Sequence, residues 1–454
     1  YFCRVLDREP FSPEELEAIE AHMWAIVDED APVIKEKVPI EDALDMFRRR
    51  GDEDKVRLFC RRRKDYLVLY KLRGFRDYFH GYMLPSTGYL QTFDLHPLPP
   101  GFVLQYPRRH WPTELRPYAE YPQLNAVFRE YGDWLSLLGV DDVGSLNTVV
   151  EKGNVRELVL VSEALHEDRI AQIAHQINEQ RDEVKLVLIA GPSASGKTVF
   201  SKRLSIQLLA HGIQPFPLAL DDYFVNREDT PRDEKGEYDF EALQAVDLPF
   251  FNDQLLALMN GEEVTLPHFD FHEGRREEGP TVQLGPDHVI LVEGIHGLNP
   301  DLVPAIPEES IYRIYSSALT QLNIDRHNRV PTTDTRLLRR IVRDAAYRGY
   351  TAEETLERWE SVRRGEKRYI FPYQEHADVM FNSALVYELS VLKPMAEPLL
   401  LQIKNASPRR VEAKRLLAFL EWFVPCSTEI VPDNSILREF IGGSILQDYI
   451  PSRR

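Results

Sequence analysis

The amino-acid sequence predicts an α/β domain with a parallel sheet and flanking helices, preceded by an α+β region. The main observation is that short continuous apolar runs alternate with helical segments from residue 182 onward. Such runs are typical of parallel strands that are buried on both faces. A second observation is the length of 454 residues, which exceeds what one hydrophobic core usually supports. We therefore expect two or three domains.

The α+β region is expected to span residues 1–150. A helix is expected to begin at Ser12, because Ser12 is a good N-cap, Pro13 suits the first helical position and acidic residues fill the first turn. Residues 66–72, YLVLYKL, predict a strand. Proline and aromatic residues crowd residues 83–122 and predict irregular or β structure there.

A linker helix is expected over residues 151–181, because apolar residues recur on one helical face. The α/β domain follows over residues 182–404, and residues 405–454 are expected to form a helical tail. The expected strands of the α/β domain cover residues 184–190, 216–220, 288–294 and 310–317, and its expected helices cover residues 199–211, 243–259 and 336–347.

Composition limits the classes of function. The formal net charge is -18 at pH 7, so a phosphate backbone would be repelled outside local basic patches, and bulk nucleic-acid binding is not expected. No apolar run is long enough to predict a membrane span. The 3 cysteines are far apart and fit a reducing compartment, so a cytoplasmic location is expected. The chain begins at Tyr1 rather than Met, which is consistent with a missing N-terminal piece.

Residues 191–198, GPSASGKT, match the phosphate-binding pattern GxxxxGK[ST]. In such a loop, successive backbone N–H groups converge on phosphate oxygens, and the helix that follows adds its positive end. Lys197 is expected to reach the β- and γ-phosphates and the Thr198 hydroxyl to hold Mg²⁺. The alternative is a chance match in a turn, which the strand before and the helix after disfavour. The residues expected to bind nucleotide are Gly191, Ser193, Ala194, Ser195, Gly196, Lys197 and Thr198.

Carboxylates follow two of the expected strands. Asp221 and Asp222 come after residues 216–220, and Glu293 ends the apolar run of residues 288–293. Open α/β sheets bind ligands at the carboxyl ends of their strands. One of the two aspartates could accept the proton of a hydroxyl that receives a phosphoryl group, and Glu293 suits a metal. The alternative is that either aspartate only caps a turn.

Residues 268–272, HFDFH, combine aromatic rings with polar side chains. Such a combination suits a planar ring, for example a nucleobase. The alternative is a β-hairpin that packs its own aromatic side chains, and the residues alone slightly favour it.

Four arginines recur at helical spacing in the segment TRLLRRIVRD: Arg336, Arg339, Arg340 and Arg343. Arginines on a mobile helix above the site would bind the transferring phosphoryl group. The alternative is a solvated face whose arginines pair with nearby acids such as Asp334 and Asp344.

Seven segments occur in an order that resembles the uridine kinase and phosphoribulokinase family: GPSASGKT, LALDDYF, YDFEALQAVDLP, LPHFDF, VILVEGIHGL, DTRLLRRIVRD and YIFPYQEHADVMF. The resemblance covers about residues 182–400. It implies a P-loop kinase fold with a five-stranded parallel sheet, ATP and Mg²⁺ as cofactors, and phosphorylation of a hydroxyl group.

The resemblance also implies roles for single residues. It makes Asp221 the general base, places Glu293 with Thr198 and Asp221 at the metal, and gives Asp247 the ribose hydroxyls. It assigns the pyrimidine ring to Phe269 and Phe271, and the lid to Arg336, Arg339 and Arg343. Uridine kinases carry a base-contacting histidine where this chain has Gly274; His272 is the nearest substitute, in a different register.

The front segment, roughly residues 1–95, resembles the second additional domain of threonyl- and alanyl-tRNA synthetases, through FSPEELEAIEAHMWAIVDEDAPVIKEKVPIEDALDMFRRRGDEDKVRLF and the later PSTG. In threonyl-tRNA synthetase this domain hydrolyses mischarged tRNA at a site of histidines and a cysteine. Two of those positions are Phe79 and Met83 here, and neither binds a borderline metal well. The resemblance therefore implies an editing-like domain without its metal site.

The leading hypothesis is an ATP- and Mg-dependent kinase of a small-molecule hydroxyl acceptor, with a nucleoside such as uridine or cytidine expected and a homo-oligomer allowed. One alternative is a kinase of a different polyol or sugar. Another is a P-loop NTPase with an RNA-related binding role, for which residues 61–64 are a local basic patch.

Overall fold

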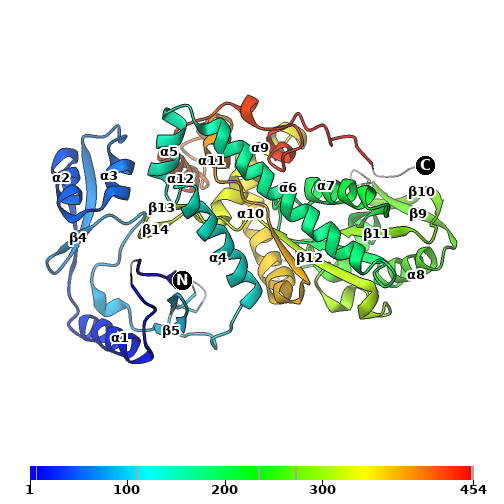
Figure 1. The fold of residues 1–454 in the computed structure, drawn as a ribbon, viewed down its shortest axis with the longest axis horizontal. Helices are drawn as coiled ribbons and strands as arrows, with labels where there is room; N and C mark the ends of the chain where they lie inside the picture. Colours follow the sequence, from blue (N-terminus) through cyan, green and yellow to red (C-terminus); the bar gives the residue numbers. More distant parts are fainter. Residues whose placement is uncertain (7, 109–110, 234–235, 271–272, 451–454) are drawn as a thin grey trace. The chain divides into compact units, whose positions relative to one another are not determined.

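The computed structural model describes residues 1–454 except residues 7, 109–110, 234–235, 271–272 and 451–454 (Figure 1). The chain divides into two compact units. The smaller unit comprises Tyr1–Tyr121 together with Asp325–Asn328, and the larger unit comprises Pro122–Ile324 together with Arg329–Arg454.

The division falls after Tyr121, whereas the sequence led us to expect a boundary at residue 150. Helices α4 (Pro122–Leu137) and α5 (Val143–Glu151) lie in the larger unit. The reason is packing, since Val127 of α4 is buried in one cluster with Tyr315 and Met380 of the larger unit's sheet.

The larger unit is built on a parallel sheet in the strand order β15-β12-β7-β11-β8. The predicted parallel sheet is thus confirmed, with the five strands that the family resemblance implied. The edge strand β8 contains Pro215 and Pro217, which an edge position tolerates because fewer ladder bonds are needed there. The strands are β7 (Leu186–Ala190), β8 (Gln214–Ala219), β11 (His288–Glu293), β12 (Ile311–Ser317) and β15 (Val379–Asn382).

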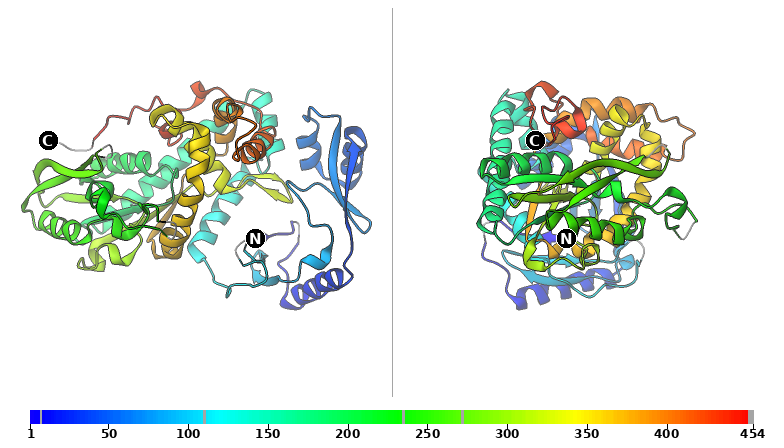
Figure 2. Two further views of the ribbon diagram at one scale, coloured as in Figure 1. Left: turned by 180° about the vertical axis from the view of Figure 1, so that it is seen from behind. Right: turned by 90° about the vertical axis from the view of Figure 1, so that its right-hand side faces the viewer.

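Helices α6 (Val155–Glu179) and α7 (Lys197–Ala210) lie along one face of this sheet (Figures 1 and 2). Ile170 and Ile177 of α6 are fully buried there beside Val187 and Ile314 of the sheet. Alternate residues of a strand point to opposite faces, so Leu186 and Leu188 of β7 face the other side. The expected linker helix, residues 151–181, therefore contains the whole of α6 and is part of the core.

The opposite face of the sheet is covered by α8 (Leu248–Met259) and by the hairpin of β9 (Glu263–Asp270) and β10 (Arg275–Gln283). Phe251 and Leu255 of α8 are fully buried in this cluster. The other elements of the larger unit are β13 (Asn323–Asp325, whose last residue belongs to the smaller unit), β14 (Asn328–Arg329, whose first residue does), α9 (Thr332–Tyr347), α10 (Ala352–Gly365), α11 (Glu388–Leu401), α12 (Arg410–Leu420) and α13 (Arg438–Ile441).

The smaller unit is α+β, with two antiparallel sheets in the orders β1-β6-β5 and β2-β3-β4. Its first helix begins as predicted, because Ser12 and Glu15 form a reciprocal capping box. Its elements are β1 (Phe2–Cys3), α1 (Pro13–Asp28), β2 (Val33–Pro39), α2 (Ile40–Arg50), α3 (Glu53–Phe59), β3 (Tyr66–Leu72), β4 (Phe75–Asp77), β5 (Asp94–Leu98) and β6 (Gly101–Gln105).

A buried group of charges lies inside the smaller unit. Lys55 is 1% exposed, and its Nζ lies 3.5 Å from Asp77 Oδ1 and 3.3 Å from Asp325 Oδ1. Asp77 Oδ2 also lies 2.8 Å from Nδ1 of His327. A buried charge is tolerated only when it is paired, so the four residues Asp325–Asn328 supply part of what stabilises Lys55.

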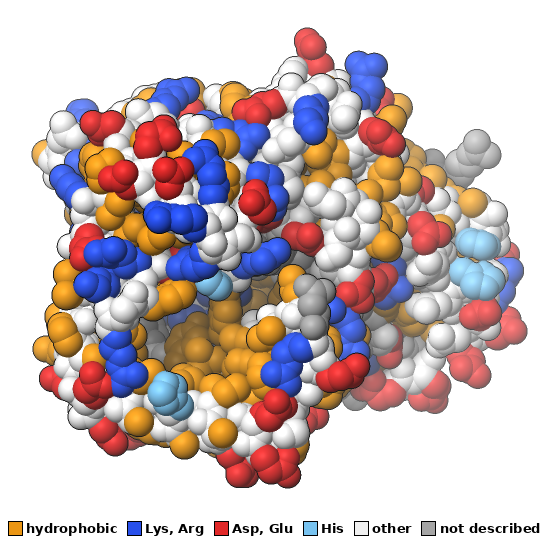
Figure 3. Space-filling model, turned by 60° about the vertical axis from the view of Figure 1, so that its left-hand side comes forward, with side chains coloured by type: hydrophobic (Ala, Val, Ile, Leu, Met, Phe, Trp, Pro, Cys, Tyr) orange, Lys and Arg blue, Asp and Glu red, His pale blue; other side chains and the backbone are white. Residues whose placement is uncertain are grey.

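Lys and Arg side chains are interspersed with Asp and Glu over the face shown in Figure 3, with hydrophobic side chains exposed among them. The negative net charge is therefore not gathered into one acidic surface on that face. Within the residues that the structure describes, no helix combines the length and the apolar character needed to cross a membrane.

Candidate active site

The loop of residues 191–198 joins β7 to α7, as the sequence predicted. Gly191 has no room for a side chain, because a Cβ there would lie 1.9 Å from the carbonyl oxygen of Ser316. Lys197 Nζ donates to the carbonyl oxygens of Gly191 at 3.0 Å and Pro192 at 3.3 Å. The lysine thus folds back over its own loop. The other loop residues, Ser193, Ala194 (φ 57°), Ser195 and Gly196 (φ 86°), complete the turn into α7.

Two groups suited to a metal meet at the carboxyl end of β11. The Thr198 hydroxyl donates to Glu293 Oε1 at 2.9 Å. Desolvation raises the pKa of Glu293 to about 7, and the charge of Lys197 opposes this rise. Hydroxyl and carboxylate oxygens are ligands that Mg²⁺ accepts, usually one or two from the protein with the rest from phosphates and water. The residues present therefore fit Mg²⁺, although no cluster of three or more His, Cys, Asp or Glu is poised for a metal in the described part of the chain.

Asp221 lies in a 3₁₀ turn, Leu220–Tyr223, directly after β8. Desolvation by the surrounding protein raises the pKa of the Asp221 carboxyl; Lys197 opposes the rise and Asp222 adds to it. Asp222 has another role, because its Oδ1 accepts the backbone N–H of Phe269 at 3.1 Å and fixes the β9–β10 hairpin. The structure thus separates the two adjacent carboxylates, with Asp221 toward the phosphate loop and Asp222 toward the hairpin.

Arg336 and Arg339 of α9 lie behind the phosphate loop, fully buried. Arg336 pairs with Glu366 and donates to the carbonyl oxygen of Ser193 at 2.9 Å. Arg339 pairs with Glu388 and donates to the Ser383 carbonyl oxygen at 2.8 Å. In this structure the two arginines support the loop from behind, and their role in a mobile lid stays a prediction.

Arg340 and Arg343 of α9 have different partners. Arg340 Nη1 donates to the Ser193 hydroxyl at 2.8 Å. Arg343 pairs with Asp344 at 3.0 Å and lies 3.9 Å from Glu439. Both are only partly buried, so Arg340 and Arg343 are the arginines of α9 that remain accessible beside the loop.

The hairpin carries the residues that the sequence suggested for an acceptor. Asp247 is the N-cap of α8 and pairs with Arg276 of β10 at 3.0 Å. Phe269 is 3% exposed and meets Phe224 edge to face. The ring of Phe269 thus packs into the protein, as the hairpin alternative expects, and its contact with a substrate stays a prediction. Phe271 and His272 lie outside the described residues.

Gly274 has a φ of 70°, a conformation that residues with a side chain rarely adopt. A Cβ at this position would lie 2.6 Å from Cζ of Arg227. The space beside Gly274 thus belongs to the Arg227 side chain. A histidine could not replace Gly274 here without moving that arginine.

Two further groups near the site had no clear signal in the sequence. Desolvation raises the pKa of Glu241 to about 7, while Arg340 opposes the rise and Glu366 and Asp221 add to it. His296, three residues after Glu293, is 1% exposed, and neither of its ring nitrogens makes a hydrogen bond to the residues that the structure describes. Glu293 could be predicted because it ends an apolar strand. Glu241 lies in an irregular segment, where no sequence pattern separates a carboxylate at the site from other carboxylates.

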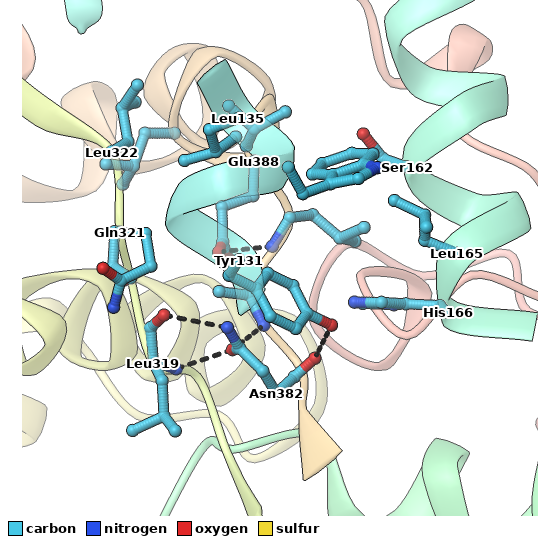
Figure 4. Close-up of a pocket in the computed structure, with 16 residues that line it drawn as sticks. Tyr131, Leu135, Ser162, Leu165, His166, Leu319, Gln321, Leu322, Asn382 and Glu388 are labelled. Carbon is cyan, nitrogen blue, oxygen red and sulfur yellow. Dashed lines mark hydrogen bonds between the residues drawn. The ribbon is translucent and has the colours of Figure 1, made fainter. Parts of the chain in front are cut away.

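A small apolar cavity also lies in the larger unit (Figure 4). It is lined by α4, α6 and the segments that follow β12 and β15; the Tyr131 hydroxyl donates to the Asn382 carbonyl oxygen at 3.0 Å. His166 of α6 points into this region and is 1% exposed. Within the described part of the chain, neither of its ring nitrogens makes a hydrogen bond, although the backbone of Asn382 and Ala384 lies near.

His166 makes stability dependent on pH. Burial, with the charges of Arg203 and Arg339, lowers its pKa from 6.5 to about 3. As pH falls from about 6.5 toward about 3, the unfolded chain therefore takes up a proton that the folded chain does not, and stability is lost by up to about 1.4 kcal/mol per pH unit. Urea unfolding at pH 7.5 and 5.5 is expected to show a smaller loss for His166→Phe than for the wild type. His175→Phe, at an exposed position on α6, should lose as much stability between these pH values as the wild type. Equal losses of stability in all three chains would contradict the prediction.

Comparisons with known proteins relate part of the larger unit to kinases. The family model described as "Phosphoribulokinase / Uridine kinase family" matches residues 186–390. A uridine kinase from Borrelia hermsii is 30% identical over 213 residues, which cover 46% of this chain and 93% of that protein. A uridine kinase from Staphylococcus epidermidis is 28% identical over 200 residues, covering 44% and 87%. A solved structure of a possible uridine kinase from Bacillus stearothermophilus is 21% identical and covers 47% of this chain and 98% of that one, with a TM-score of 0.33.

A five-stranded parallel sheet with a phosphate loop after β7 and carboxylates at the ends of β8 and β11 defines a P-loop kinase that acts on a small molecule. The chain belongs to the phosphoribulokinase/uridine kinase family.

Proposed function

We propose that this protein transfers the γ-phosphoryl group of Mg-ATP to a hydroxyl group of a nucleoside such as uridine or cytidine. The observation that carries the proposal is the position of Asp221. Its carboxyl lies at the end of β8, within the electrostatic reach of Lys197 in the phosphate loop. A kinase that phosphorylates a hydroxyl group needs a group at this position that takes the proton of that hydroxyl. An NTPase that only hydrolyses its nucleotide does not need a binding site for a phosphoryl acceptor beside it.

In the proposed phosphoryl transfer, each of these residues has a separate role. The loop N–H groups bind the phosphates, and Lys197 exchanges its carbonyl partners for phosphate oxygens. Thr198 and Glu293 would hold Mg²⁺, together with Asp221 as the family resemblance implies, and the ion would neutralise charge on the phosphates. Asp221 accepts the proton of the attacking hydroxyl while a new O–P bond forms and the bond to ADP breaks. The accessible arginines of α9 are placed to offset charge on the phosphoryl group.

The acceptor is assigned to the space between Asp221 and the β9–β10 hairpin. Asp247 and Arg276 offer hydrogen-bond acceptors and donors for sugar hydroxyls. The similarity to uridine kinases supports a nucleoside. Gly274 and the adjacent Arg227 make this edge different from one with a histidine, so another polyol or a sugar remains the alternative acceptor.

A substrate screen tests the proposal. The full chain with Mg-ATP is expected to form ADP faster with uridine or cytidine than without acceptor, and mass spectrometry is expected to find the nucleoside monophosphate. Lys197→Ala should abolish the reaction, because the lysine alone carries the positive charge of the loop. ADP formation that needs no acceptor would instead identify an NTPase, and turnover only with sugars or other polyols would reassign the acceptor.

We also propose, on the resemblance to synthetase domains alone, that the smaller unit derives from an editing-like domain. Its α+β composition and antiparallel sheets are compatible with that origin. Phe79 is half-buried and Met83 exposed, and no group of three or more metal-binding side chains occurs in the described residues. We therefore assign it no hydrolytic role.

A further inference from the structure

The C-terminal segment of the larger unit packs against the phosphate loop. Within it, α13 is anchored by Ile436, Leu437 and Phe440, all fully buried. The side chain of Ile436 fills the space beside Gly196, since a Cβ on that glycine would lie 2.4 Å from Ile436 Cγ2. The segment that leads into α13 thus contacts the loop through the buried side chain of Ile436.

Between these apolar residues, Glu439 points at the start of α7. Its Oε2 accepts the backbone N–H of Val199 at 3.3 Å. Val199 is the third residue of α7, and the first N–H groups of a helix have no partner within the helix. In a phosphate loop these N–H groups are the donors that bind the phosphates of a nucleotide. The Glu439 carboxylate therefore accepts a hydrogen bond from an N–H group that is expected to bind a phosphate.

Other charges at the site respond to Glu439 as they would to an anionic ligand. Its Oε1 lies 3.9 Å from Nη1 of Arg343, so the carboxylate engages one of the accessible arginines of α9. The carboxylate thus contacts both an N–H donor at the start of α7 and a cation where phosphates are expected.

We propose that Glu439 is an internal phosphate mimic that competes with the nucleotide for the start of α7. Nucleotide binding displaces the carboxylate from the Val199 N–H and from Nη1 of Arg343, while Arg343 keeps its ion pair with Asp344. Only the side chain of Glu439 has to turn, because the buried apolar residues keep α13 in place. Lys202 holds the segment after α13, since it donates to the carbonyl oxygens of Leu446 and Gln447 at 2.7 and 2.8 Å.

A purely structural role for Glu439 makes a different prediction. A carboxylate that only caps α7 would stabilise the fold, and its loss would lower stability without improving nucleotide binding. Competition requires that removal of the charge tightens nucleotide binding. Glu439→Gln separates these roles, because glutamine keeps the size of the side chain and an oxygen for the Val199 N–H but loses the negative charge.

The inference rests on the nucleotide binding proposed above, and titration calorimetry of the full chain with Mg-ADP and Mg-ATP tests it. Glu439→Gln is expected to bind about tenfold more tightly than the wild type, which corresponds to about 1.4 kcal/mol. Glu429→Gln, an exposed position in the same segment, is the matched control for net charge and should bind like the wild type. Glu439→Asp keeps the charge on a shorter side chain and should fall between them.

Unchanged or weaker binding by a folded Glu439→Gln chain would overturn the phosphate mimic and leave the kinase proposal standing. An equal gain in Glu429→Gln would also overturn it, since the gain would then reflect net charge alone. If neither the wild type nor Glu439→Gln binds either nucleotide, the proposed function fails as well, and with it the inference.

Discussion

Replacing Asp221 with asparagine is expected to lower kcat by about 10²–10⁴-fold, the usual contribution of a general base. The amide cannot accept the proton of the acceptor hydroxyl, although it keeps the size of the side chain. The raised pKa of Asp221, which desolvation causes, brings the carboxyl closer to the proton affinity that a base at neutral pH needs. Binding of Mg-ATP should change little, because the phosphates are bound by the loop and Lys197.

Steady-state kinetics with a saturating acceptor, and calorimetry with Mg-ATP, measure the two halves of this prediction. Asp253→Asn is the matched control, since Asp253 is exposed on α8 and away from the loop. Full transfer activity in the Asp221→Asn chain would remove Asp221 as the base and direct attention to Glu241, the neighbouring carboxylate whose pKa desolvation raises to about 7.

Replacing Arg339 with alanine is expected to lower the free energy of unfolding of the larger unit by about 3–5 kcal/mol. Arg339 is fully buried, and its loss would leave Glu388, which is 2% exposed, as a buried charge without its main partner. The Ser383 carbonyl oxygen would lose its donor as well. The phosphate loop would then lose support from behind, so nucleotide binding should weaken together with stability.

Urea unfolding followed by circular dichroism measures the effect. Arg348→Ala provides the control, because this side chain is 52% exposed at the end of α9, and an exposed pair contributes less than about 1 kcal/mol. The double variant Arg339→Met with Glu388→Leu should regain much of the stability, since removing both charges leaves no unpaired one. A stable Arg339→Ala chain with a reduced kcat would instead restore the lid interpretation.

The strands and the phosphate loop could be predicted because each has a local signal. The residues of β7 are apolar throughout, since that strand is covered on both faces, and the loop needs glycine where the backbone of Ser316 approaches. Strand β15, only VMFN, is too short to show periodicity, and it was implied only by the family resemblance. The boundary after Tyr121 had no local signal either, because it depends on the packing of α4 against distant strands.

The arginines of α9 show the limit of spacing as evidence. Their positions on the helix could be predicted, but not which of them are buried, because Glu366 and Glu388 come from later segments of the chain. Sequence spacing therefore could not separate Arg336 and Arg339, which support the loop, from Arg340 and Arg343, which stay accessible. The contact of Glu439 with Val199 spans 240 residues and had no sequence signal at all.

The four residues Asp325–Asn328 limit how freely the two units could be exchanged between proteins. They lie between Ile324 and Arg329 of the larger unit, yet they supply Asp325 and His327 to the buried charges around Lys55. A fragment that ends at Tyr121 would keep Lys55 and Asp77 but lose those two partners. Recombination that transferred only residues 1–121 would therefore not transfer the whole smaller unit. A change in either unit has to remain compatible with β13 and β14, which contain residues of both units.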